Sequence, residues 1–320
     1  MSPRASLGCL LAGVVALALP TAPFARVQQK KPKTIRVETS LVLVEATVKD
    51  RAGLAVDGLT QADFEITDDG LPQTISHFSR DQLPLAVALV VDLSTSIYPY
   101  LDQLRYSLQS SLLTLKAEDE VALFTFTYDV QKRIGLTHNK SAVANQFDVL
   151  PIGGSTNIND ALYLAAHFLR EEAPAARRVI ILVSDNVASQ EGKFAPKEVE
   201  NEIIKSDAVL YSLKIPGENT LGEQKYIEMA GPSLVNVSKI VPHTGGEIFE
   251  VQKEGSLSAA FAALILRLKA RYTLGFMPDY SAGNGRFHSL EVRLASGRCK
   301  GCSVRTKRGY FAVPAPSDSQ

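Results

Sequence analysis

Five apolar runs alternate with helical patterns through the centre of the chain, and together they indicate its fold class. The runs cover residues 85–92, 121–127, 179–184, 209–215 and 247–251, and the first, LAVALVVD, is apolar at every position before its final Asp. Between them, apolar residues recur at helical spacing over residues 98–116, 158–172, 196–206 and 257–270. Strands that are apolar on both sides are typical of a parallel sheet covered by helices on both faces. We therefore expect an α/β domain with a doubly wound, mostly parallel sheet over residues 84–270.

Both flanks of this domain instead alternate apolar and polar residues, as half-buried strands do. Residues 34–80 contain IRVETSLVLVEATVKD and a hairpin signal at Asp69-Gly70, and residues 271–313 alternate again between Gly-rich turns. Three or four strands make a poor core by themselves, so each flank needs partners. We expect both flanks to build one small Ig-like β-sandwich, into which the α/β domain is inserted, followed by a flexible tail at 314–320. Its core should join these residues: Val42, Val44 and Phe64 with Leu274, Leu290 and Val292.

The first 26 residues have the pattern of an export signal. Arg4 supplies a positive charge, residues 7–19 form an apolar run shorter than a bilayer span, and Ala16-Leu17-Ala18 offers small residues for cleavage. An uncleaved anchor is the alternative. A signal peptide predicts an exported, secreted protein of the periplasm or the extracellular space. A basic linker at residues 27–33 follows the signal segment.

Charge and cysteine content narrow the function classes. Lys plus Arg and Asp plus Glu number 34 each, so no net field favours nucleic acid. Cys9 would leave with the signal, and Cys299 and Cys302 would remain as a pair in an oxidising compartment. A local disulfide is the favoured interpretation of that pair. A redox CxxC motif would require a helix N-terminus, and a zinc site would require two further ligands.

Oxygen-bearing side chains follow three of the predicted strands or loops at one edge of the sheet. Asp92, Ser94 and Ser96 follow the first strand, Thr156 follows a Gly pair before a helix, and Asp185 ends the strand VIILVSD. Ligand sites of open α/β sheets form beyond the carboxyl ends of the strands. Carboxylate and hydroxyl oxygens suit a hard cation such as Mg²⁺ or Mn²⁺. These five residues are therefore the candidate metal site.

Asp92-x-Ser94-x-Ser96, Thr156 in a GGxT loop and Asp185 at a strand end resemble the metal-ion-dependent adhesion site of the von Willebrand factor A (VWA) domain. The resemblance covers roughly residues 84–270. The flanking segments GLTQADFEITDDGLPQTISHFS, YTLGFMP and RTKRGYF resemble exported bacterial VWFA-related domain proteins. One departure is Asn186, where the family usually has Gly after the Asp. Because Asn tolerates the left-handed backbone, we expect little change in geometry there.

The resemblance implies a function without catalysis. In that family Ser94, Ser96 and Thr156 would contact the metal directly or through water, and Asp92 and Asp185 would accept hydrogen bonds from water or hydroxyls. A partner protein's Asp or Glu would complete the coordination. The expected function is thus metal-dependent protein binding of the adhesion type, with no small-molecule substrate and no nucleic acid.

Two alternatives remain open. One is a metal-independent structural scaffold of the cell envelope, since a fold can persist after its site is lost. The other is a Mg²⁺-dependent phosphoaspartyl enzyme, which would require a second carboxylate where Ser94 stands. A serine hydrolase is disfavoured because no GxSxG motif is present. The five histidines show no metal-ligand spacing, and we expect surface or locally bonded roles for His77, His138, His167, His243 and His288.

Overall fold

The computed structural model describes residues 41–80, 83–146, 153–217, 231–251, 256–278, 285–295 and 299–312. These residues all belong to one compact unit, Val37–Gln320. The predicted export signal, the linker at 27–33, residues 34–40 and the tail at 314–320 lie outside the described residues and stay predictions.

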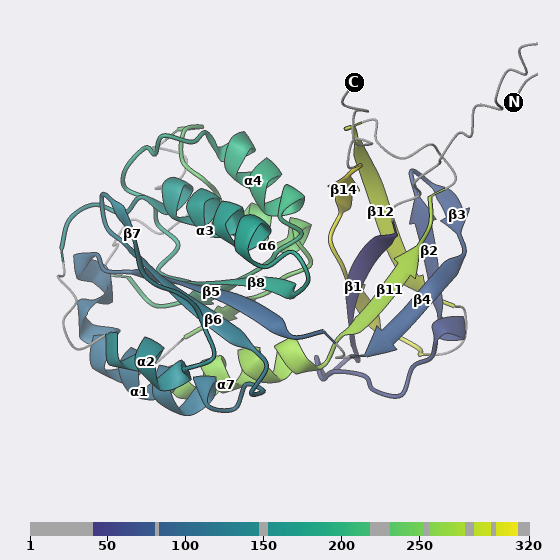
Figure 1. The fold of residues 1–320 in the computed structure, drawn as a ribbon, viewed down its shortest axis with the longest axis horizontal. Helices are drawn as coiled ribbons and strands as arrows, with labels where there is room; N and C mark the ends of the chain where they lie inside the picture. The colour runs from purple at the N-terminus through teal and green to yellow at the C-terminus, as the bar shows by residue number, and fades with distance from the viewer. Residues whose placement is uncertain are drawn as a thin grey trace, which may run out of the picture. The chain divides into compact units, whose positions relative to one another are not determined.

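The centre of the chain forms a six-stranded sheet with the order β10-β9-β8-β5-β6-β7 (Figure 1). Five strands run parallel: β5 (Leu85–Asp92), β6 (Glu120–Phe126), β8 (Arg177–Ser184), β9 (Val209–Lys214) and β10 (Ile248–Glu250). The edge strand β7 (Val130–Thr137) runs antiparallel to β6. The expected α/β class with a mostly parallel sheet is confirmed. β7 was not predicted, because its mixed sequence VQKRIGLT lacks the apolar run of the other strands.

Two layers of helices cover this sheet (Figure 1). One face packs against α1 (Leu101–Leu112), α2 (Lys140–Asn145) and α7 (Ser256–Lys269), and the other against α3 (Ile158–Glu172), α4 (Pro196–Lys205) and α6 (Val237–His243). In β5, Leu85, Val87, Leu89 and Val91 point to the first face, and Ala86, Ala88 and Val90 to the second. Burial on both faces explains why this strand is apolar throughout.

The helix expected over residues 98–116 begins later than its pattern indicates. Thr95–Tyr100 form a 3-10 helix (η2) that contains Pro99, and the α-helix α1 starts at Leu101. Proline lacks the N–H that a helix interior uses, so it is tolerated in this first segment. Helix α3 has the predicted bounds, whereas the short helices α2 and α6 were not predicted.

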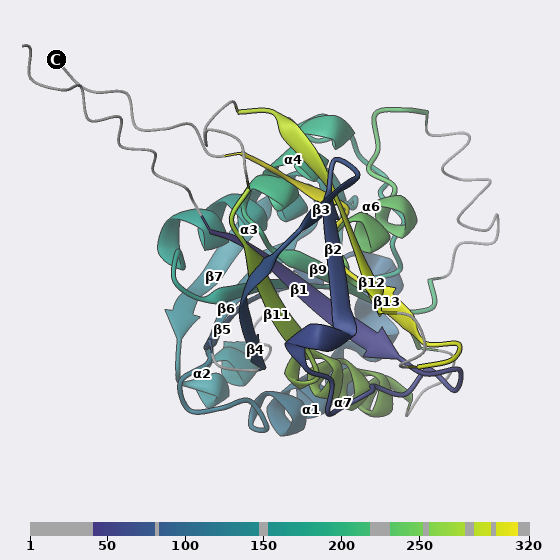
Figure 2. The same ribbon diagram turned by 90° about the vertical axis from the view of Figure 1, so that its right-hand side faces the viewer.

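The flanks build two four-stranded sheets, and each sheet mixes strands from both ends of the chain (Figure 2). The first has the order β13 (Ser303–Arg305), β1 (Val42–Lys49), β11 (Tyr272–Phe276) and β4 (Ile75–Arg80). The second has the order β14 (Gly309–Phe311), β12 (Phe287–Leu294), β2 (Phe64–Asp68) and β3 (Leu71–Gln73), and a short 3-10 helix, η1 (Gln61–Asp63), precedes β2.

One buried cluster joins the two flanking sheets. Val44 pairs with Leu274 across β1 and β11, and Val292 pairs with Ile66 across β12 and β2. The six residues expected to meet all belong to this cluster: Val42, Val44, Phe64, Leu274, Leu290 and Val292. Neither flank supplies a complete sheet, because β1 lies between β11 and β13, which both come from the C-terminal flank.

Charged side chains connect β1 with the α/β part. Glu45 pairs with Arg177 at the start of β8 and, at 2.7 Å, with Arg271. Both arginine side chains are 3% exposed, and Arg271 also donates to the Tyr211 hydroxyl. Burial opposes ionisation of Glu45, but the two guanidinium groups prevail and lower its pKa to about 2. Burying these charges is tolerated because they are paired.

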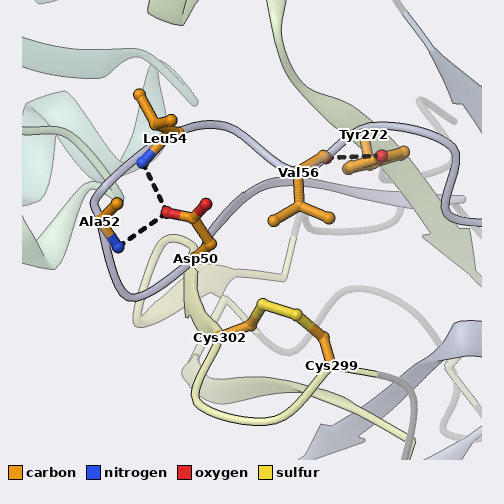
Figure 3. The surroundings of a disulfide bond; sticks show 7 residues. All are labelled: Asp50, Ala52, Leu54, Val56, Tyr272, Cys299 and Cys302. Atoms are coloured by element: carbon orange, nitrogen blue, oxygen red, sulfur yellow. Dashed lines mark hydrogen bonds between the residues drawn. A yellow bond between two sulfur atoms is a disulfide. The ribbon is translucent and has the colours of Figure 1, made fainter.

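Cys299 and Cys302 form the expected disulfide beside the loop after β1 (Figure 3). In that loop the Asp50 carboxylate accepts hydrogen bonds from the amides of Ala52 and Leu54, each at 2.9 Å. Because its two cysteines are three residues apart, the disulfide closes a small turn between strands β12 and β13. No helix within the described ranges is long and apolar enough to cross a membrane.

Candidate metal centre

Asp92 ends β5 and is the most deeply buried carboxylate of the predicted site, with no exposed surface. Its Oδ1 accepts a 2.8 Å hydrogen bond from the Ser94 amide, and its Oδ2 accepts a 2.7 Å bond from the Ser184 hydroxyl. Both oxygens are thus engaged by groups at the same sheet edge, where the parallel strands β5 and β8 end side by side. The bonds fix the direction of the carboxylate.

Ser94 and Ser96 follow at the entrance to η2. Their hydroxyl oxygens lie 3.0 Å apart, and Ser94 is the N-cap residue of that helix. Its hydroxyl makes no capping bond to the helix backbone, so helix capping does not explain a serine at this position. The pair presents two neighbouring oxygens next to Asp92.

Thr156 lies in the loop that leads into α3. Gly153 and Gly154 adopt φ angles of 122° and 100°, which favour glycine, and the Gly153 amide donates to the Leu93 carbonyl at 2.9 Å. The Thr156 amide donates to the Ser189 hydroxyl at 2.8 Å, and its carbonyl accepts the Ser189 amide at 3.0 Å. The Thr156 loop is therefore tied to the Asp92 loop on one side and to the Asp185 loop on the other.

Asp185 follows β8 and is 7% exposed. Its Oδ1 accepts the Val187 amide at 3.0 Å, and the backbone of Gly217 lies so close that a Cβ there would stand 2.4 Å from Oδ2. Asn186 has the left-handed backbone predicted for it, with φ of 65°, and its Oδ1 accepts the Ser212 hydroxyl at 2.9 Å. The departure from Gly thus keeps the turn that the family's Asp-Gly would make.

The electrostatics of the site favour a cation. Burial raises the pKa of Asp92 to about 6, against the hydrogen bonds that it accepts, and the nearby charge of Asp185 adds to the rise. Two carboxylates close enough to oppose each other's ionisation are stabilised by a positive charge between or beside them. The donors here are carboxylate and hydroxyl oxygens, which match Mg²⁺ or Mn²⁺ better than a soft metal. The residues present are therefore compatible with a divalent metal.

The structure joins the five predicted residues to different degrees. Hydrogen bonds connect Asp92 with Ser94 and Ser94 with Ser96. Asp185 acts on Asp92 through its charge and through its neighbour Ser184. Thr156 shares no hydrogen bond with the other four among the described residues, and Ser189 connects its loop with that of Asp185.

Two residues that support the site were not predicted from the sequence. Ser184 binds Asp92 and also accepts the Asn186 amide at 3.1 Å, and Ser189 holds Thr156. Ser184 directly precedes Asp185, so its place in the sequence was a signal for it. Nothing in the sequence pointed to Ser189.

The histidines all have nearby hydrogen-bond partners, as expected for locally bonded residues. One of them also belongs to a group that no sequence spacing revealed. Potential ligand atoms of Asp68, Asp69 and His288 lie within 4.8 Å of one another in the flanking sheets. Asp69 bonds to His288 at 2.9 Å and Tyr310 donates to Asp68 at 3.0 Å, so hydrogen bonding accounts for these contacts.

Residues 87–188 match the sequence profile of the von Willebrand factor type A domain, and this range holds all five predicted site residues. The chain contains a von Willebrand factor type A domain. None of the curated proteins matches the chain significantly.

Solved structures similar to the chain include two bacterial proteins and one from a mussel. An aerotolerance-related membrane protein from Bacteroides fragilis is 16% identical, with 57% of this chain and 99% of that chain covered and a TM-score of 0.42. BatB from Bacteroides thetaiotaomicron is 15% identical, with 57% and 98% covered and a TM-score of 0.43. Proximal thread matrix protein 1 from the mussel byssus has a zinc-occupied MIDAS (metal-ion-dependent adhesion site) motif. It is 19% identical, with 63% of this chain and 49% of that chain covered and a TM-score of 0.45.

Proposed function

We propose that this protein is an exported, non-enzymatic binding module that recognises a protein partner through a divalent metal, Mg²⁺ or Mn²⁺, held in its VWA domain. The observation that carries the proposal is the buried Asp92 carboxylate, whose two oxygens are directed by Ser94 and Ser184 beside a pair of hydroxyls 3.0 Å apart. Such a carboxylate gains most from a cation, because burial penalises its charge when no counter-charge is close.

In this proposal Ser94, Ser96 and Thr156 hold the metal, and Asp92 and Asp185 orient the hydroxyls and water around it. The metal supplies positive charge to which an acidic group of the partner binds. The protein residues contribute few direct negative charges, so an Asp or Glu from the partner is the favoured remaining ligand.

An enzyme that forms a phosphoaspartate fits these residues less well. Its nucleophile would have to be Asp92, which has no exposed surface and has both oxygens engaged in hydrogen bonds. The position two residues later, where such enzymes need a second carboxylate, is Ser94.

We also propose the domain organisation that the strand pairing supports. The VWA domain, residues 84–270, is inserted in an Ig-like β-sandwich made of residues 34–80 and 271–313. An export signal over residues 1–26 would place the protein in the periplasm or outside the cell, free or associated with the envelope, where Cys299 and Cys302 can form their disulfide.

Metal binding is tested by calorimetric titration of Mg²⁺ and Mn²⁺ into the full chain, together with thermal unfolding. We expect saturable binding and a melting temperature that rises with either metal and returns with EDTA. Asp92→Asn and Thr156→Ala should each remove both effects. Glu172→Gln is a matched control, because Glu172 is exposed at the opposite end of α3 from the Thr156 loop.

The controls separate the proposal from its alternatives. Binding retained in Asp92→Asn would contradict the assignment of the site. A wild-type protein that neither binds these metals nor changes its melting temperature would favour the metal-independent scaffold. Release of inorganic phosphate from a phosphomonoester, lost in Asp92→Asn, would favour the enzyme.

A further inference from the structure

A pocket of about 190 Å³ lies next to the candidate metal centre and is not part of it. Leu93, one residue after Asp92, and Gly153, three residues before Thr156, contribute to its wall. The rest comes from the end of β6, the turn after it and the start of β7, with these residues: Thr125, Phe126, Thr127, Tyr128, Asp129, Gln131 and Arg133. The pocket therefore adjoins the loops that carry Asp92 and Thr156.

The cationic side chain of the pocket, Arg133, occupies an irregular position in β7. Leu123 pairs with Ile134 and Phe124 with Lys132, so Arg133 is the extra residue of a β-bulge. A bulge bends a strand and re-aims a side chain, and bulges are enriched next to functional sites. Lys132, one residue earlier, points to the other face and lies 4.7 Å from the Phe168 ring centroid.

Arg133 is held by one hydrogen bond that leaves the end of its side chain available. Its Nε donates to the Thr125 hydroxyl at 2.9 Å, and Thr125 is 1% exposed. Across the described part of the chain, this is the one hydrogen bond of the Arg133 side chain. Anchoring at Nε fixes the guanidinium plane, and the two terminal nitrogens retain the fork geometry that binds a carboxylate in a bidentate manner.

Tyr128 completes the wall on the side of the metal loops. Its side chain is 59% exposed, and it packs over Gly154, where a Cβ would lie 3.6 Å from the ring. A rigid aromatic residue beside an arginine is a frequent combination at the energetic centres of protein interfaces. The pocket therefore has a charged donor and an apolar wall within one hollow.

We propose that this pocket binds a second acidic side chain of the partner, next to the one that binds the metal, with Arg133 as the specificity-determining residue. The connection with the metal rests on the proposed function, whereas the affinity of the pocket for a carboxylate does not. Asp129, which also lines the pocket, weakens this binding by like-charge repulsion. Because Asp129 is exposed, water and salt screen its charge.

The first experiment measures the pocket alone, in EDTA. Glutarate is titrated into the full chain, labelled with ¹⁵N, and the Nε–H signal of Arg133 and the amide signals of Thr127 and Gln131 are followed by NMR. We expect saturable shifts with glutarate and none with glutaramide, its neutral analogue. Arg133→Gln should weaken glutarate binding about tenfold or more, because bonds to charged groups contribute about 1.5–3 kcal/mol.

Asp129→Asn should change the affinity for glutarate in the opposite direction. It retains the size of the side chain and removes the repulsion, so glutarate should bind more tightly. Thr125→Val should weaken binding less than Arg133→Gln, because it releases the guanidinium without removing its charge. Equal shifts with glutaramide, or unchanged affinity in Arg133→Gln, would overturn the proposal.

The second experiment distinguishes a free carboxylate ligand from a protein partner. Acetylated peptides with one Asp and one Glu, separated by glycine spacers of increasing length, are titrated with Mg²⁺ and with EDTA. We expect one spacer length to bind far more tightly with Mg²⁺ than either acidic group alone, because the second contact becomes intramolecular. Binding to the pocket without any gain from Mg²⁺ would refute the link to the metal and leave a small carboxylate as the ligand.

Discussion

The Ser184 hydroxyl donates a 2.7 Å hydrogen bond to the Asp92 carboxylate, across a sequence separation of 92 residues. Ser184 has no exposed surface, and it also accepts the Asn186 amide. This single side chain therefore connects the strand end that carries Asp92 with the turn that carries Asp185.

Ser184→Ala should lower both stability and metal affinity. The substitution leaves an oxygen of the buried Asp92 without its donor, at a cost of about 1–3 kcal/mol in the free energy of unfolding. Urea unfolding in EDTA measures the stability, and calorimetry with Mg²⁺ measures the affinity. Ser184→Thr retains the hydroxyl and should restore part of both. An alanine variant with unchanged metal affinity would show that Ser184 does not direct Asp92.

Substitutions of Asn186 test its left-handed backbone. Asn186→Ala loses the bond from Ser212 and places an alanine at φ of 65°, which costs about 1–2 kcal/mol for a residue with a Cβ. Asn186→Gly loses the same bond but removes the backbone cost. We therefore expect Asn186→Gly to be more stable than Asn186→Ala in urea unfolding. The reverse order would mean that the turn changes its conformation.

Glu45 should make stability depend on acid pH. Its pKa is lowered from 4.5 to about 2 in the folded protein, so its contribution is present above pH 4.5 and disappears as the pH falls toward 2. The difference corresponds to about 3 kcal/mol. Unfolding of wild type and Glu45→Gln, measured at several pH values, should show a wild-type advantage that shrinks over this interval. A constant advantage would contradict the contribution of the Arg177 and Arg271 pairs.

The disulfide should contribute modestly to stability and nothing to metal binding. Cys299 and Cys302 are three residues apart, and closing so short a loop restricts the unfolded chain by about 2 kcal/mol at most. The double substitution of both cysteines by serine should lower the free energy of unfolding by no more than this amount. Its Mg²⁺ affinity should equal that of wild type, and a loss of metal binding would contradict the separation of the two features.

The proposed organisation of the flanks predicts that they open together. Leu274 is fully buried between them, so Leu274→Ala should cost about 2–5 kcal/mol. Hydrogen exchange should then speed up in β1, β2 and β12 alike, and much less in β5 and β8. Leu266→Ala is the control, because Leu266 is 68% exposed on α7. Protection retained in β1 and lost only in β11 would mean that the flanks open independently.

The sequence by itself determined those helices and strands whose pattern of apolar residues continues over their full length. The apolar run of β5 and the helical spacing of α3 predicted their observed bounds. A strand buried on both faces is apolar at consecutive positions, and an amphipathic helix has apolar residues at helical spacing. The order of Asp92, Thr156 and Asp185 likewise indicated the loops at the carboxyl ends of the sheet. The edge strand β7 has no such pattern, because its residues are only half buried or exposed.

Only the tertiary structure decided how distant groups meet. The bond between Ser184 and Asp92 requires β8 to lie beside β5, and the pairing of β1 with β11 and β13 joins residues from opposite ends of the chain. The position of Arg133 depends on a bulge, which is a matter of register between β6 and β7 rather than of residue type. Register follows from the packing of both strands against the rest of the protein, so no local segment of the sequence contains it.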